Sequence, residues 1–200
     1  MQPFSLRSAV PKAMGSPSGL RLEALLGSLA ILCATFGVAL AQPSAPTQAL
    51  RFEALGGATL QVPSWKEIRR EGAVAVYEQL PESGAQRPYY VLMCALEEGP
   101  PKGAPVAWDK VRDNIMQAAS KNGRTLTLEV KEPYTGAAGF ESRRLVGEFK
   151  SATPEKKVAI ELIALVKDGK LLTIGLVAEA LGPATAELTQ AVARSARLGP

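Results

Sequence analysis

The chain of 200 residues contains no histidine. Histidine is the commonest general base near neutral pH and a frequent ligand of zinc and non-haem iron. Its absence excludes Ser-His and Cys-His catalysis and the usual histidine-containing metal sites. No P-loop, dinucleotide-binding glycine motif or EF-hand loop is present either. We therefore predict no catalytic, cofactor-binding or metal-binding residue and no enzymatic activity.

Cysteine is almost as scarce, with only Cys33 and Cys94 in the chain. Cys33 lies in an N-terminal segment that we expect to be removed, so Cys94 would have no intramolecular disulfide partner. Cys94 belongs to an apolar run at 90–96, where a buried small side chain is expected rather than a reactive thiol. Leu32 precedes Cys33 and argues against lipidation, because lipoprotein signals have Gly, Ala or Ser at that position.

Runs of like charge are also missing. The 23 Lys and Arg residues and 19 Asp and Glu residues are interspersed along the chain. Without its first 41 residues the chain carries a formal net charge of only +2. Such a mixed-charge surface is typical of a solvated protein and predicts no nucleic-acid partner.

The first 41 residues have the pattern of an export signal. Basic residues precede an uncharged run at 24–41, which ends in Ala39, Leu40 and Ala41. We predict cleavage after Ala41 and a periplasmic or secreted mature chain with no stable membrane insertion. An uncleaved anchor is the alternative, since 18 uncharged residues can just span a bilayer. Whether translation begins at Met1 or Met14 stays open.

Downstream of the signal we expect a flexible linker at 42–49 and one domain at 50–198. The linker is rich in Pro, Ala, Ser, Thr and Gln. Apolar patterns predict two helices, at 106–121 and from Pro183 onward, where Leu188, Ala191 and Val192 share a stripe. They also predict strands at 50–52, 58–62, 73–80, 89–96, 126–130, 140–149, 158–166 and 171–178.

The strands at 158–166 and 171–178 are separated by Asp168 and Gly169, which is a strong hairpin signal. Two of the predicted strands, 90–96 and 158–166, are apolar on both faces and so should be covered on both sides. We therefore expect an α+β domain of the α/β/α sandwich type, with a single, mainly antiparallel sheet flanked by two principal helices.

This layout resembles the PsbP/Mog superfamily over residues 50–198. The matching features are an early strand leading into Pro63 and Trp65, the helix that contains Trp108, the hairpin at Asp168, and the final helix that ends at 193–198. The resemblance implies a small α/β/α sandwich and, for many bacterial members, export. It also implies an accessory, scaffolding or binding role. The superfamily shares no catalytic residue set, so no site is carried over.

Few side chains offer chemistry. Ser64 and Lys66 are the right types for Ser-Lys catalysis, but no supporting motif follows. Glu97 and Glu98 lie at a strand end, where solvated charge is expected. Glu67 and Glu71 flank Arg69 and Arg70, a pattern that we interpret as an exposed, salt-bridged turn.

Two further features are read as structural. The segment 136–139 begins and ends with glycine and could let backbone approach an anion, but no helix follows it, so a tight connection is expected. Four aromatic residues are more typical of the core or a sheet face than of a ligand platform, although we would inspect them first as interface anchors: Trp65, Tyr89, Tyr90 and Tyr134.

We conclude from the sequence that the protein is an exported, non-enzymatic accessory or binding protein of the cell envelope. Its partner, an envelope protein or a small ligand, and its binding residues are unknown. One alternative is a histidine-free hydrolase with two carboxylates about 5–10 Å apart. The other is a membrane-tethered structural protein, which requires the leader to stay attached.

Overall fold

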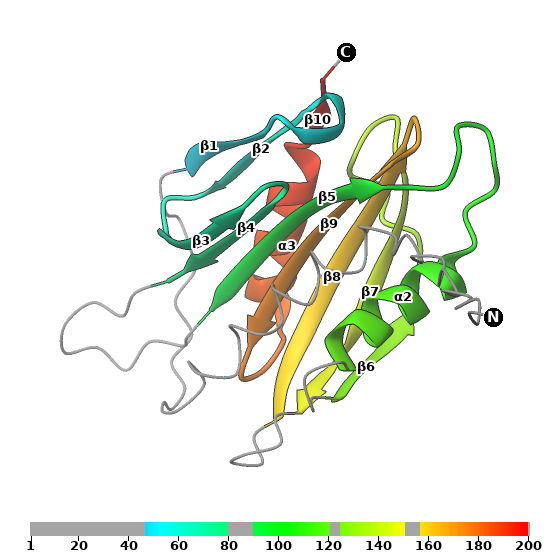
Figure 1. Cartoon of the computed structure of the whole chain (residues 1–200). Helices are drawn as coiled ribbons and strands as arrows, with labels where there is room; N and C mark the ends of the chain where they lie inside the picture. Colours follow the sequence, from blue (N-terminus) through cyan, green and yellow to red (C-terminus); the bar gives the residue numbers. More distant parts are fainter. Residues whose placement is uncertain (1–46, 80–89, 121–124, 151–156, 200) are drawn as a thin grey trace, which may run out of the picture.

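The computed structural model describes residues 47–79, 90–120, 125–150 and 157–199 (Figure 1). The predicted signal, its cleavage site and the linker residues before Thr47 lie outside these ranges. The two α-helices are α2 (Trp108–Ser120) and α3 (Pro183–Arg194), and η2 (Ala54–Gly56) is a short 3-10 turn. The strands are β1 (Thr47–Phe52), β2 (Ala58–Pro63), β3 (Lys66–Glu71), β4 (Val74–Glu78), β5 (Val91–Glu98), β6 (Thr125–Val130), β7 (Glu141–Lys150), β8 (Lys157–Lys167), β9 (Lys170–Ala178) and β10 (Arg197–Leu198).

The strands form two sheets. The larger has seven strands in the order β3-β4-β5-β9-β8-β7-β6, and every neighbouring pair is antiparallel. The smaller has three strands in the order β1-β2-β10. Helix α2 packs against β6 on one face of the large sheet, and α3 packs against β8 and β9. Figure 1 shows these two helices on opposite faces.

The predicted α/β/α sandwich with one helix-flanked sheet is therefore wrong, because strands dominate and they form two sheets. The reason lies in β2, which pairs with β1 and with β10 but not with the large sheet. Its alternating pattern correctly predicts a hairpin with β1. An alternating pattern does not identify the second strand with which β2 will pair. That strand is β10, which lies far from β2 in the sequence.

The larger sheet has an apolar layer on each face. The layer on the α2 side runs across the sheet from β4 to β6 and includes Trp108, Val111 and Ile115 of the helix. On the other face, α3 and the three-stranded sheet cover β4, β5, β9 and β8 together. The predicted double-sided burial of the runs at 90–96 and 158–166 is confirmed, since these segments are central strands.

The hairpin and the helices also follow from local sequence. Asp168 and Gly169 connect β8 to β9 with positive φ angles of 51° and 75°, as a tight hairpin turn requires. At the start of α3, the Gly182 N–H donates to the Thr185 hydroxyl at 2.8 Å. The stripe predicted for α3 is only partly right: Leu188 and Val192 are buried, whereas Ala191 is exposed.

The two edges of the large sheet are protected in different ways. Five of the six residues of β3 are charged, and the strand has a register shift between Glu67 and Arg69. Both features discourage pairing with another chain. At the opposite edge, α2 packs on β6. The segment that contains Glu67 and Glu71, which we predicted to be a salt-bridged turn, is therefore strand β3. Its charged side chains are those of an edge strand and do not indicate a turn.

Candidate functional site

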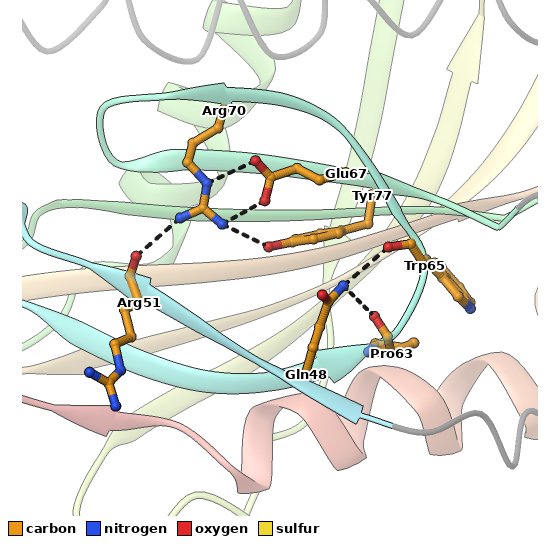
Figure 2. A network of polar contacts seen from close by, with 7 residues as sticks. All are labelled: Gln48, Arg51, Pro63, Trp65, Glu67, Arg70 and Tyr77. Carbon is orange, nitrogen blue, oxygen red and sulfur yellow. Dashed lines mark hydrogen bonds and ion pairs between the residues drawn. The ribbon is translucent and has the colours of Figure 1, made fainter.

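The densest polar network lies where the two sheets meet (Figure 2). Arg70 of β3 donates from Nε to Glu67 Oε1 at 2.9 Å and from Nη2 to Glu67 Oε2 at 2.5 Å. Its Nη2 also donates to the Tyr77 hydroxyl at 3.1 Å, and its Nη1 donates to the Arg51 carbonyl at 3.2 Å. Arg70 therefore binds residues of both sheets through all three of its nitrogens.

A second contact in Figure 2 joins β1 to the turn before β3. The Gln48 amide donates to the carbonyls of Pro63 and Trp65 at 3.2 and 3.1 Å. The Trp65 ring stacks on Tyr90, with ring centroids 6.1 Å apart and planes inclined by 13°. These contacts thus fix the connection between β2 of the small sheet and β3 of the large sheet, and the Trp65 ring of that connection packs on Tyr90, directly before β5.

The electrostatics of this junction fit a structural role. The hydrogen bond from Arg70 holds the pKa of Glu67 below its ordinary value. Burial raises the pKa of the Tyr77 phenol, so Tyr77 stays neutral and acts as a hydrogen-bonding group. A carboxylate held charged by an arginine and a phenol held neutral are both unsuited to proton transfer near neutral pH.

The other catalytic candidates are not brought together. Ser64 and Lys66 are both exposed, one in a bend and the other in β3. Glu97 and Glu98 are consecutive residues of β5, so their side chains point to opposite faces of the sheet. Glu71 pairs with Arg69 at 2.7 Å, which confirms the salt bridging predicted for this segment.

The candidate aromatic platform belongs mostly to the core. Trp65 and Tyr90 are 7% and 6% exposed, so neither presents a ring to solvent. Tyr134 lies on the connection between β6 and β7 and donates its hydroxyl to the Gln190 carbonyl of α3 at 3.0 Å. Tyr89 lies outside the described residues. In the segment 136–139, Ala137 is buried in the same layer as α3, which agrees with a structural connection.

Cys94 is fully buried in β5, as the sequence predicts. Burial raises the pKa of its thiol to about 12, so the reactive thiolate is scarce at neutral pH. Cys94 therefore acts as a small core side chain.

Sequence reasoning missed one polar pair. Glu161 of β8 is 0% exposed and accepts a hydrogen bond from Arg144 Nε at 2.6 Å. Arg144 also donates from Nη1 to Glu132 at 3.3 Å, toward the surface. The second carboxylate oxygen of Glu161 is buried and has no hydrogen-bond partner. The available signal was that Glu161 is the one charged residue in the run at 158–166.

A shallow hollow of about 350 Å³ lies beside the β8–β9 hairpin. It is lined by residues 100–106 of the connection before α2, by Glu141 and by residues 166–169. Lys102 and Asp168 form an ion pair across its rim at 2.8 Å. Both side chains are solvated, so the pair marks an exposed rim and not a desolvated recognition site.

Within the described ranges no group of three or more Cys, Asp or Glu side chains is placed to hold a metal ion. No helix in the same ranges is long and apolar enough to cross a membrane.

No protein-family model matches the chain, and no curated protein matches it significantly. Among solved structures, the chain is similar to LpqN, a protein involved in cell envelope biogenesis of Mycobacterium tuberculosis. The sequences are 18% identical, and the TM-score is 0.38 over 78% of this chain and 91% of LpqN. A likeness of this degree carries no argument about function, and membership of the PsbP/Mog superfamily stays a prediction.

Proposed function

We propose that the protein is an exported accessory or binding protein of the cell envelope that acts through contacts with a protein or a small ligand. Export rests on the sequence pattern at 24–41 and the cleavage pattern that ends at Ala41. The binding role rests on the state of the ionisable side chains.

The observation that carries the proposal is that four carboxylates of the described residues are paired with cations. Glu67 and Glu71 are paired with arginines of their own strand, and Glu161 is paired with Arg144. In the hollow beside the hairpin, Asp168 is paired with Lys102. A hydrolase of the carboxylate type needs two carboxyl groups that face one cleft, one of them protonated. The pKa values of Glu67 and Asp168 are lowered by Arg70 and Lys102, so these two carboxyl groups favour the charged state, which supports a binding role.

The function is tested by capture and by assay of the same preparation. The purified full chain, immobilised through a C-terminal tag, should retain a specific protein or ligand from a cell-envelope extract, whereas a tag-only column should not. Hydrolysis of ester, glycoside or peptide substrates by the pure protein, abolished by Glu161→Gln, would overturn the proposal and favour the hydrolase.

Export is tested separately by the N-terminus of the protein recovered outside the cytoplasm. Mass spectrometry should find a chain that begins at Gln42. Replacement of Ala41 by Asp should leave the leader attached, because signal peptidase requires a small residue there. Recovery of an intact leader from the unsubstituted protein would contradict cleavage and favour the tethered alternative.

A further inference from the structure

Strand β6 ends the large sheet on one side, and its outer edge pairs with no other strand of the described residues (Figure 1). Helix α2 packs on β6, and its buried side chains share one apolar layer with Leu126 and Leu128. This layer lies on a face of the sheet, whereas the backbone N–H and C=O groups of a strand lie in the plane of the sheet. The helix therefore covers the face of β6 and not the hydrogen-bonding groups at its edge.

Two contacts show which backbone groups of β6 point away from the sheet. The Lys131 N–H, directly after β6, donates to the Arg144 carbonyl of β7 at 2.7 Å. The Thr127 carbonyl also points toward β7, since a Cβ at Gly147 would collide with its oxygen. The N–H and C=O of one residue point to the same side of a strand, and successive residues alternate. The residues that present one donor and one acceptor outward are therefore Leu126, Leu128 and Val130.

The edge of β6 differs from the edge at the other end of the same sheet. In β3, five of six residues are charged and the register shifts between Glu67 and Arg69. In β6, Glu129 is the one charged residue of six, and the register with β7 is continuous. Charged side chains and bulges are devices that keep an edge strand from pairing. Strand β6 has neither feature along its length, so its edge is suited to strand addition.

The length and the chemistry of this edge define what can bind to it. Six residues of an antiparallel strand span about 20 Å, which is the length of an equally short extended segment. Another extended backbone is the partner that meets alternating donors and acceptors at this spacing. An added strand would place alternate side chains beside buried Leu126 and Leu128, and the others beside exposed Thr125 and Thr127. The segment should therefore alternate apolar and polar residues.

A second copy of the chain fits this edge less well. Antiparallel pairing of β6 with its copy would place the two α2 helices next to each other on one face of the joined sheet. The exposed side chains of α2 are polar or charged, so they would add little apolar contact. The interface would then consist mainly of one strand edge, whereas a stable interface takes roughly 800 Å² from each partner. These exposed residues of α2 are Asp109, Lys110, Asp113, Asn114 and Gln117.

We propose that the outer edge of β6 binds an extended segment of a partner protein as an added strand, through backbone hydrogen bonds to Leu126, Leu128 and Val130. This inference rests on the proposed binding function and names the surface and the kind of partner for it. The backbone hydrogen bonds supply affinity, and the alternating side chains of the segment supply selectivity.

The test uses the full chain and a soluble peptide that alternates valine and threonine over the length of β6. Hydrogen exchange of the segment 125–130 should slow when the peptide is added, because its outward N–H groups become bonded, and exchange of the segment 66–71 should not change. The matched control is a peptide with the same side chains and every backbone amide N-methylated, which can donate no backbone hydrogen bond and should have no effect. Unchanged exchange at 125–130, or equal slowing by both peptides, would overturn the proposal. This readout needs no substituted protein.

Paired variants at one position sharpen the result. Val130→Pro removes one outward donor without removing a bond to β7, and its ring obstructs the edge, so it should weaken peptide binding about tenfold. Val130→Ala shortens the same side chain but keeps the N–H, and it should retain binding. The unfolding temperature of each variant checks that it is folded. Equal binding of the peptide by the two folded variants would overturn the proposal.

Two further outcomes separate this inference from its alternatives. Light scattering of the full chain should find a monomer, and a dimer that Val130→Pro dissociates would overturn the proposal in favour of pairing between two copies. Specific capture of an envelope protein that is equally strong with Val130→Pro would overturn this inference alone and leave the proposed function standing.

Discussion

Arg144 and Arg70 make the same kind of contact in different surroundings. Each arginine donates to a glutamate of the large sheet through a short hydrogen bond. The glutamate bound by Arg144 is 0% exposed, whereas the side chains of Arg70 and Glu67 are 41% and 36% exposed. One pair is thus closed to water on the carboxylate side, and the other is open to it.

This difference in exposure indicates which of the two arginine–glutamate pairs the stability of the fold depends on more. A buried carboxylate that loses its partner keeps its full desolvation penalty, whereas an exposed one recovers hydration from solvent. Glu161 already has one oxygen with no hydrogen-bond partner, so Arg144 provides its only polar contact among the described residues. Arg70 donates four hydrogen bonds, but water can replace most of them.

The largest expected effect comes from Arg144→Leu. Because this change leaves Glu161 charged and unpaired inside the sheet layer, it should destabilise the protein by about 3–5 kcal/mol. Urea denaturation followed by circular dichroism measures the loss. Glu161→Gln is the matched control, since an amide is isosteric and needs no counterion, and it should cost less than Arg144→Leu.

The double replacement Arg144→Leu with Glu161→Leu sharpens the same comparison. Apolar side chains of similar size in place of both partners should recover most of the stability that Arg144→Leu loses, because no buried charge remains. A double variant as unstable as the single one would show that Arg144 stabilises the sheet by packing and not through its charge.

A smaller effect is expected at the junction of the two sheets. Tyr77→Phe removes the hydroxyl that Arg70 binds and should cost about 1 kcal/mol, the usual net value of one hydrogen bond. The same denaturation measurement checks it. Thr127→Val, at an exposed hydroxyl far along the sheet, is the control and should cost less. If Tyr77→Phe lowered the free energy of unfolding as much as Arg144→Leu does, the contrast between the exposed contacts of Arg70 and the buried contact of Arg144 would not hold.

Local features of the fold were predictable from the sequence. Asp168 and Gly169 predict the β8–β9 hairpin, and the spacing of Trp108, Val111 and Ile115 predicts α2, because both signals depend on residues close together in the chain. The separate three-stranded sheet was not predictable, since it requires β10 at the C-terminal end of the domain to pair with β2.

The polar contacts likewise include some that were predictable from the sequence and one that was not. The ion pairs within β3 join residues two or three positions apart and could be read from the sequence. The pair formed by Arg144 and Glu161 spans 17 residues and depends on the register of β7 against β8. A single charge within an apolar strand predicts that a partner is needed but does not identify it.

The smallest expected effect concerns stability in acid. Its dependence on pH should distinguish the exposed pair of Arg70 and Glu67 from the buried pair of Arg144 and Glu161. The pKa of Glu67 is lowered in the folded state by its bond with Arg70, so the unfolded chain binds a proton more readily. Its stabilising contribution is therefore present above the ordinary value of 4.5 and is lost as the pH falls through the lower folded pKa. Glu67→Gln should reduce stability slightly at pH 7, and the difference from the unsubstituted protein should shrink as the pH falls below 4.5 and through the lowered pKa of Glu67. Unfolding temperatures measured from pH 7 to pH 3 check this, with Glu129→Gln as an exposed control. A difference that stays constant across this range would mean that Glu67 acts through packing. The exposed pair of Arg70 and Glu67 would then resemble the buried pair of Arg144 and Glu161.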